Sequence, residues 1–195
     1  MAKFTADRVF RFWQFSLLAI ALLLAIGCGS KGPRAQQGAQ HPAVGQPLMF
    51  LDLEPLTGDG ATITAESLKG RVTLMNFWAT WCPPCRIEFP HLAAMTKKLS
   101  ADSKFQFLSV NTDDESVDEA RELAKKFLLE QGVSHPTWAD PTRGTWAGLA
   151  QHFGASGIPL TVVIDSQGIV RGIWNGYVRG DEVAMEALVL ELLKE

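Results

Sequence analysis

The sequence has few cysteines and no excess of basic residues, and both shortages exclude whole classes of protein. Its 195 residues contain 3 cysteines, too few for a small domain held together by disulfides, and the odd number leaves one cysteine without a partner in the chain. Eighteen Lys and Arg stand against 21 Asp and Glu, and a net charge of −3 argues against nucleic-acid binding. With 47% hydrophobic and 20% charged residues, the chain is long and apolar enough for one globular domain with a core.

The N-terminus differs in composition from the rest of the chain. A basic start with Lys3, Arg8 and Arg11 precedes an apolar run over residues 12–26. This run is short for a membrane span, which needs about 20 apolar residues. Basic start, apolar middle and small residues at the end are the parts of an export signal. We therefore predict a leader over residues 1–27, with an uncleaved membrane anchor as the alternative.

The leader ends in the letters LAIGC, which resemble the lipobox of bacterial lipoproteins. Ala25 stands where that family most often has leucine. The resemblance implies cleavage before Cys28, lipidation of its thiol and attachment to a membrane through the N-terminus. A plain signal peptide with a cysteine nearby is the alternative. Residues 28–43 carry almost no large apolar side chain, and we predict a flexible tether there.

From residue 44 to residue 195, short apolar runs alternate with helical patterns, which predicts an α/β domain. Expected strands cover residues 48–53, 61–64, 71–77, 105–110, 160–164 and 169–174. Expected helices cover residues 83–99, 117–131 and 145–153, and a last helix starts near Asp181 and closes the chain. Ser116 and Glu119 form the capping box of the second helix.

Cys82 and Cys85 lie where the strand over 71–77 gives way to the helix over 83–99. Two cysteines three residues apart at a helix start lie on one face, close enough for a disulfide. Cys82 is placed at the N-cap, where the helix dipole and free amides favour a thiolate. Cys85 lies one turn inside and can attack a mixed disulfide formed at Cys82. The pair predicts thiol–disulfide exchange.

Other interpretations of the cysteine pair lack the residues they need. Structural zinc requires a second ligand pair, and none appears at suitable spacing, so no metal is expected. Haem attachment requires histidine directly after the second cysteine, where Arg86 stands. A structural disulfide stays open as an alternative. His91, His135 and His152 are scattered and are interpreted as surface or packing residues, and we expect no cofactor.

The segment MNFWATWCPPCRIEFP strongly resembles the active site of thioredoxin-fold proteins of the TlpA/ResA type. These are exported, often membrane-tethered thiol–disulfide oxidoreductases related to the CcmG/DsbE proteins of cytochrome c maturation. The resemblance covers residues 44–195 and implies a central mixed sheet flanked by helices, with an N-terminal strand extension. It also implies an extracytoplasmic monomer whose partners are exported proteins with thiols or disulfides and a membrane or periplasmic redox donor.

The same resemblance implies further site residues. Ile158 and Pro159 match the cis-proline loop that faces the cysteines, where the backbone of Ile158 would bind a substrate strand. Glu88 matches a glutamate of ResA-like proteins. One turn below Cys85, it would raise the pKa of the thiols or relay a proton, and a solvated helix glutamate is the alternative. Thioredoxin has a buried aspartate where this chain has Asn76, which cannot accept a proton.

Several neighbours of the cysteines also carry predictions. Trp81 is expected to shield Cys82 and contact substrates, whereas Trp78 is interpreted as core. Pro83 and Pro84 have no N–H, so only the amide of Cys85 remains in the first turn to stabilise a Cys82 thiolate. Less stabilisation of the reduced form tilts the protein towards a reductant. The acidic run over 113–115 is interpreted as a solvated loop.

Two other function classes remain for comparison. Peroxiredoxins share the fold, but they require threonine three residues before the reactive cysteine. Ala79 occupies that position here, and the threonine, Thr80, comes one residue later. A binding module that kept the fold would usually have lost the cysteines. The sequence therefore favours a thiol–disulfide oxidoreductase, with a peroxiredoxin-like thiol peroxidase as the alternative.

Overall fold

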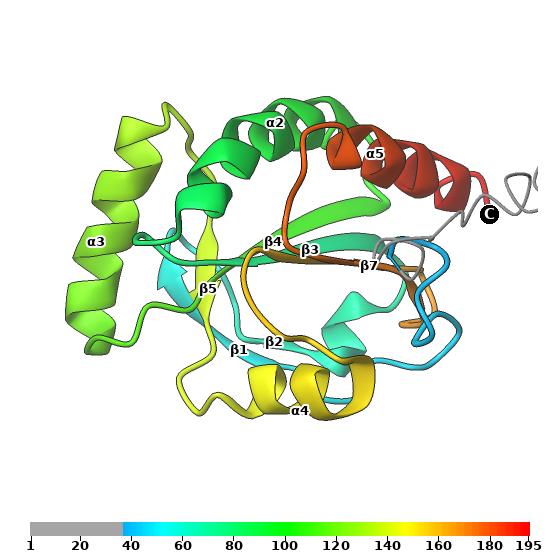
Figure 1. Cartoon of the computed structure of the whole chain (residues 1–195), viewed down its shortest axis with the longest axis horizontal. Helices are drawn as coiled ribbons and strands as arrows, with labels where there is room; N and C mark the ends of the chain where they lie inside the picture. Colours follow the sequence, from blue (N-terminus) through cyan, green and yellow to red (C-terminus); the bar gives the residue numbers. More distant parts are fainter. Residues whose placement is uncertain (1–36) are drawn as a thin grey trace, which may run out of the picture. The chain divides into compact units, whose positions relative to one another are not determined.

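A seven-stranded mixed sheet runs through the centre of the computed structural model, which describes residues 37–195 (Figure 1). Its strands lie in the order β2-β1-β5-β4-β3-β6-β7. The strands are β1 (Asp52–Thr57), β2 (Ile63–Thr64), β3 (Val72–Trp78), β4 (Phe105–Asn111), β5 (Thr137–Ala139), β6 (Leu160–Ile164) and β7 (Val170–Asn175). The helices are η2 (Ala65–Leu68), α2 (Pro83–Leu99), α3 (Val117–Glu130), α4 (Gly144–Phe153) and α5 (Asp181–Leu192).

Strand β3 is the centre of the sheet. It pairs in parallel with β4 and antiparallel with β6, and all seven of its residues are buried. A strand covered on both faces reads as a nearly continuous apolar run, which is why VTLMNFW was recognisable as a buried strand. Helices α2 and α5 cover one face of the sheet and α4 covers the other (Figure 1). The predicted central mixed sheet flanked by helices is confirmed.

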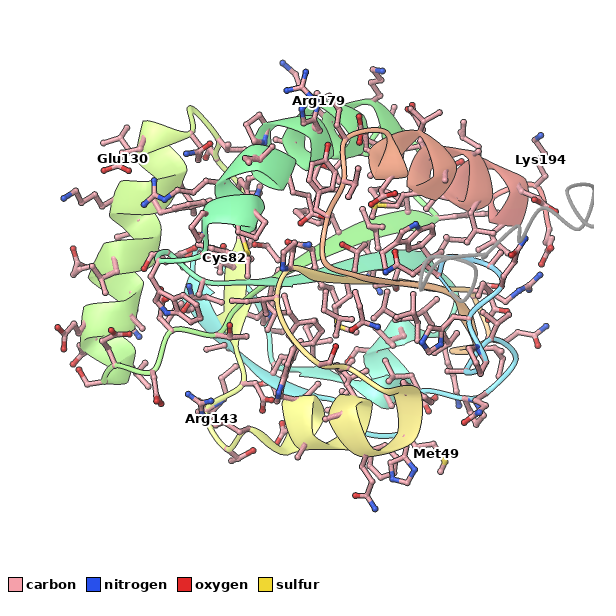
Figure 2. The ribbon with its side chains drawn as sticks, in the orientation of Figure 1. Met49, Cys82, Glu130, Arg143, Arg179 and Lys194 are labelled. Carbon is pink, nitrogen blue, oxygen red and sulfur yellow. A yellow bond between two sulfur atoms is a disulfide. The ribbon has the colours of Figure 1, made fainter. Side chains whose placement is uncertain are left out.

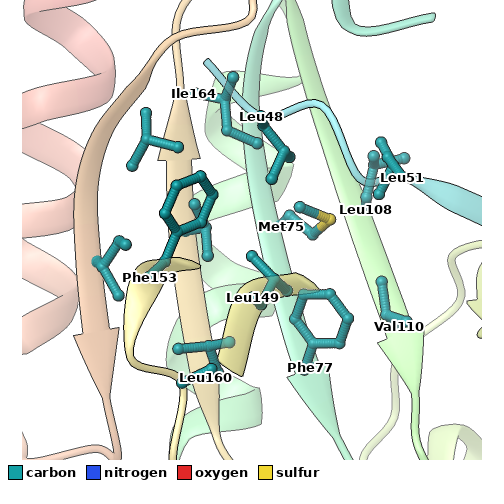
Figure 3. Packing of buried hydrophobic residues seen from close by; sticks show 14 of the residues in the cluster. Leu48, Leu51, Met75, Phe77, Leu108, Val110, Leu149, Phe153, Leu160 and Ile164 are labelled. Carbon is teal, nitrogen blue, oxygen red and sulfur yellow. The ribbon is translucent and has the colours of Figure 1, made fainter. Parts of the chain in front are cut away.

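Alternate side chains of β3 fill separate cores. Met75 and Phe77 point towards α4 and pack near Leu149 and Phe153 (Figure 3). Leu74, one position away in the strand, packs instead with the side chains of α2 and α5. This alternation follows from the two-residue period of a β-strand. It fixes which face of the sheet carries α2, the helix that begins at the cysteine pair.

Local patterns placed most elements correctly. Helix α2 and strand β6 have the predicted bounds, and the other helices and strands from β3 onward differ by one or two residues, or three at the end of α5. The prediction of the first strand is wrong, because the observed strand β1 covers residues 52–57 rather than 48–53. Leu48 and Leu51 are buried although they lie outside the strand, so their apolar character reflects packing and not strand pairing. Strand β5 was not predicted, since three residues carry no recognisable period.

Residues 37–43 do not belong to a flexible tether, and that part of the prediction is wrong. Gly38 exchanges backbone hydrogen bonds with Ile173 of β7, and the Gln37 side chain donates to the carbonyl of Asn175 at 2.9 Å. Ala43 is buried. Because β7 is an edge strand with unpaired backbone groups, a segment without large apolar side chains can pair with it mainly through main-chain bonds.

The remaining N-terminal predictions lie outside the described residues. These are the leader over 1–27, the lipidation site Cys28 and the tether up to residue 36. Within residues 37–195, no helix combines the length and apolar character that a membrane span requires.

Candidate active site

Cys82 and Cys85 are joined by a disulfide at the start of α2, with their Cα atoms 5.3 Å apart (Figure 2). Cys82 is the N-cap residue, and its Sγ accepts a hydrogen bond from the backbone N–H of Cys85 at 3.2 Å. Pro83 and Pro84 occupy the first two helical positions and offer no N–H. The structure therefore places one main-chain donor, that of Cys85, on the sulfur of Cys82.

The loop that presents Cys82 is held by Asp113. The Thr80 N–H donates to Asp113 Oδ1 at 2.9 Å, and the Asn111 side chain donates to Oδ2 at 2.9 Å. The solvated-loop interpretation is therefore wrong for Asp113. Because β3 and β4 are parallel neighbours, their carboxyl ends meet at one edge of the sheet, which brings the acidic run after β4 to the loop after β3. The outer side of the loop is held by Arg86, whose Nε donates to the Thr80 carbonyl at 3.1 Å.

Aromatic side chains pack beneath the cysteines. Trp78 is fully buried, as expected of a core residue, and its indole N–H donates to Ser109 Oγ at 2.7 Å. Its ring stacks on Phe127 with centroids 4.5 Å apart and meets the edge of Phe89 at 5.1 Å. Trp81, by contrast, is 64% exposed. Trp78 therefore belongs to the buried core beneath the site, whereas Trp81 lies on the surface, where a binding partner can contact it.

Glu88 lies one turn after Cys85 on α2, and its side chain is buried, at 1% exposure. Asn76 of β3 donates to Oε2 at 2.9 Å, and Thr161 of β6 donates to Oε1 at 3.1 Å. Asn76 also donates to Thr161 Oγ1 at 2.9 Å, so the three side chains form one buried network. The alternative of a solvated helix glutamate is wrong.

Burial raises the pKa of Glu88 from 4.5 to about 7. The hydrogen bonds from Asn76 and Thr161 favour the ionised form and oppose this rise, while the negative charges of Asp181 and Glu182 add to it. A carboxyl with a pKa near neutral pH gives and takes protons readily, which is the property of a general acid or base. Cys85 is also buried and lies one helical turn away, and side chains three residues apart on a helix are neighbours.

The Ile158–Pro159 peptide bond is cis and precedes β6, as the resemblance implied. The N–H of Gly176 donates to the Pro159 carbonyl at 2.7 Å, which ties this loop to the end of β7. Ile158 packs against the buried cluster that contains both cysteines. Trp81, Cys82, Cys85, Glu88, Ile158 and Pro159 are thus gathered at one end of the sheet.

A cleft of about 320 Å³ opens beside this site. Trp81 and Ile158 are among its lining residues, as are Arg143 and Asp114, which form an ion pair. Figure 2 shows Arg143 in the loop before α4, where it has a positive φ of 55°. Sequence reasoning missed this cleft, because loops far apart in the chain build it.

Among residues 37–195, no cluster of His, Cys, Asp and Glu has the arrangement of a metal site. His135 packs between Phe89 and Phe107, and burial lowers its pKa. His152 stacks on Phe50 with ring centroids 4.6 Å apart. Both histidines are packing residues.

Comparison with known proteins adds an independent finding. A family model described as Redoxin matches residues 30–188. The chain is 34% identical over 137 residues to "Thiol:disulfide interchange protein HelX" of Rhodobacter capsulatus, an alignment that covers 70% of this chain and 66% of the relative. It is 30% identical over 118 residues to "Thiol-disulfide oxidoreductase ResA" of Bacillus subtilis, which covers 60% of each. The chain thus spans a little less than two thirds of the length of these relatives.

A solved structure agrees with the fold. The thiol:disulfide interchange protein of the thioredoxin family from Chlorobium tepidum superposes with a TM-score of 0.57 at 28% identity, covering 76% of this chain and 97% of that one. The predicted thioredoxin-like fold is confirmed.

Proposed function

Because the chain belongs to the Redoxin family, we propose that it is an extracytoplasmic thiol–disulfide oxidoreductase that reduces disulfides of exported proteins through Cys82 and Cys85. The observation that carries the proposal is the burial of Glu88 one turn below Cys85, in a network with Asn76 and Thr161. A purely structural disulfide would not require a group of tuned acidity beside it.

In the first step, the reduced protein attacks its substrate. The Cys82 thiolate forms a bond to one sulfur of the substrate disulfide, and the other substrate sulfur leaves as a thiolate that takes up a proton. The Cys85 N–H stabilises the attacking thiolate, as it does Sγ in the oxidised protein. The product is a mixed disulfide between Cys82 and the substrate.

In the second step, Cys85 resolves the mixed disulfide. Ionised Glu88 accepts the proton of the Cys85 thiol, and the resulting thiolate attacks Cys82 Sγ. The second substrate sulfur leaves as a thiolate and receives a proton from Glu88 or water. Two electrons have passed to the substrate, and the protein ends as the Cys82–Cys85 disulfide. A membrane or periplasmic thiol donor then restores the reduced pair.

Substrates would lie across Trp81 and the Ile158–Pro159 loop. Exposed Trp81 offers an apolar platform, and the cleft that it helps to line would accommodate side chains beside the scissile disulfide. The backbone of Ile158 would pair with an extended substrate segment. The names of the relatives support disulfide-bearing proteins as substrates, and the CcmG/DsbE resemblance makes apocytochrome c one candidate.

Attachment to a membrane through lipidated Cys28 is a further part of the proposal. Nine peptide units separate Cys28 from Gln37, where the chain docks beside β7. They span at most about 30 Å, which would keep the domain close to the membrane surface. Cys28→Ser should release the protein from membranes, and unchanged membrane association would exclude this anchor.

Insulin reduction with a chemical thiol as donor tests the activity. The protein should accelerate precipitation of reduced insulin, and Cys82→Ser should abolish the acceleration. Peroxide consumption is the matched assay for the peroxiredoxin-like alternative. Rapid turnover of peroxide together with no insulin reduction would overturn the proposal.

A further inference from the structure

Helix α5 begins with two carboxylates and packs against α2, the helix that carries Glu88. The second of them, Glu182, is held by several partners. Its Oε2 accepts hydrogen bonds from the Tyr177 hydroxyl at 2.8 Å and from the Gly180 N–H at 2.8 Å. Its Oε1 lies 3.9 Å from Nδ1 of His91, and its side chain is 19% exposed. None of these contacts belongs to the exchange steps described above.

These contacts keep Glu182 ionised. Burial alone would raise its pKa, but the hydrogen bonds from Tyr177 and from backbone N–H groups outweigh that effect and lower it. Position in the first turn of a helix also favours a negative charge. Burial and the bond to the carboxylate raise the pKa of Tyr177, so the phenol keeps the proton that it donates.

The charge of Glu182 lies close to the buried carboxyl of the active site. His91 follows Glu88 by three residues on α2, so the two side chains lie on the same face of the helix, one turn apart. Glu182 contacts that neighbouring turn, and its charge acts on Glu88.

Other charged groups also lie near Glu182 and Glu88. Asp181 also acts on Glu88, and its carboxylate accepts the Val178 N–H at 2.8 Å. The positive charge of Arg179, in the same loop, works to lower the pKa of Tyr177. On α2, His91 lies one turn from Glu88, and the cysteines on the other side of Glu88 are joined in a disulfide that does not titrate. Of the α5 carboxylates, Glu182 therefore lies beside His91, and Glu186 lies beside Lys98.

We propose that Glu182 is a positioning residue of the active site, whose negative charge, held at the start of α5 beside the α2 turn that follows Glu88, disfavours the ionised form of the Glu88 carboxyl. Tyr177 keeps this charge in place, and His91 of α2 lies beside it. The proposal rests on the proposed function, in which Glu88 relays the proton of Cys85. It makes the acidity of the exchange site depend on a helix that supplies none of the reacting groups.

The test follows the ionisation of Glu88 by carboxyl ¹³C NMR in the oxidised protein, with Glu88→Gln identifying the signal. The unaltered protein should show a midpoint of about 7. Glu182→Gln should lower it by about 0.5 pH unit, the effect of one charge several ångströms away. Glu182→Asp should retain most of the original value. Glu186→Gln is the matched control, because Glu186 lies one turn later on α5 and faces Lys98, and it should change nothing.

A second variant covers the case in which Glu182→Gln does not fold. His91→Lys adds a permanent positive charge beside Glu182 on a partly exposed helix face and should also lower the midpoint. An unchanged Glu88 midpoint in either folded variant overturns the proposal, as does an equal shift in Glu186→Gln. Insulin reduction is measured separately: shifted midpoints in a protein that never reduces insulin would leave this inference standing and remove the proposed function.

Discussion

Asn76 on β3 donates a 2.9 Å hydrogen bond to Glu88 on α2, and both side chains are buried. The strand position that carries an aspartate in thioredoxin carries an amide here, and the acid comes from the helix that bears the cysteines. Glu88 and Cys85 therefore share one rigid element and lie one turn apart. This arrangement fixes their separation independently of how α2 packs on the sheet.

Glu88→Gln should remove a pH dependence of stability. The native pKa of Glu88 lies at about 7, against 4.5 for the free side chain, so between these values the native state binds more protons than the unfolded state. The stabilising contribution is complete below pH 4.5 and is lost as the pH rises through about 7. The wild-type minus variant difference in unfolding free energy should fall by roughly 3 kcal/mol across this window. Urea unfolding at several pH values measures it, and a constant difference would contradict the assigned shift.

Thr161→Val should make Glu88 a weaker acid. It removes the donor to Oε1 while keeping the shape of the side chain, so the ionised form loses a hydrogen bond and the midpoint rises above about 7. Stability should fall by about 1–2 kcal/mol at neutral pH. Thr73→Val in β3 is the matched control, because Thr73 is equally buried and bonds Gln106 instead. If the Glu88 midpoint rises as much in Thr73→Val as in Thr161→Val, the shift is a general effect of replacing a buried threonine by valine, and the prediction is wrong.

Pro84→Ala should make the protein more oxidising. An N-cap side chain accepts from the N–H of the second or third helical residue, and Pro84 occupies the second. The restored donor stabilises the Cys82 thiolate, lowers the pKa of that thiol and raises the reduction potential by about 10–30 mV. Pro83→Ala is the control, since the first helical N–H does not point to the cap. Glutathione equilibration measures both variants, and equal potentials would refute the role of the missing donor.

Asp113→Ala should loosen the loop that presents Cys82. The Thr80 N–H and the Asn111 amide both lose their acceptor, which should cost about 1–3 kcal/mol of stability and slow insulin reduction. Asp114→Ala removes only an exposed ion pair with Arg143 and should leave stability within about 0.5 kcal/mol. If the two variants behave alike in thermal unfolding and in rate, Asp113 has no special role in the loop.

Features of the fold and the site could be predicted from the sequence where residues close together in the chain determine them. The bounds of α2 and the N-cap position of Cys82 follow from cap and proline chemistry within a few residues, and they were predictable. The burial of Glu88 could not be predicted, because it is created by β3 and β6, two strands that lie far apart in the sequence. One signal was present, namely a polar residue, Asn76 or Thr161, within a largely apolar strand.

Backbone pairing was the other source of error. The 37–43 segment docks on β7 through main-chain hydrogen bonds, which leave no pattern in its side chains. The carboxylates of α5 were visible as helix-start residues, but their proximity to Glu88 depends on how α5 packs against α2. Contacts of this kind need the three-dimensional arrangement.

The rate at which Cys85 resolves a mixed disulfide, measured against pH, tests the central claim most directly. A model peptide is attached to Cys82 of the wild-type protein and of Glu88→Gln, and its release is followed by fluorescence. The wild-type rate should rise through a midpoint near the pKa of Glu88, about 7, and the variant should lose this midpoint and be slower by about 100-fold. Identical profiles for the two proteins would contradict the assignment of Glu88 as the proton relay of the Cys82–Cys85 pair.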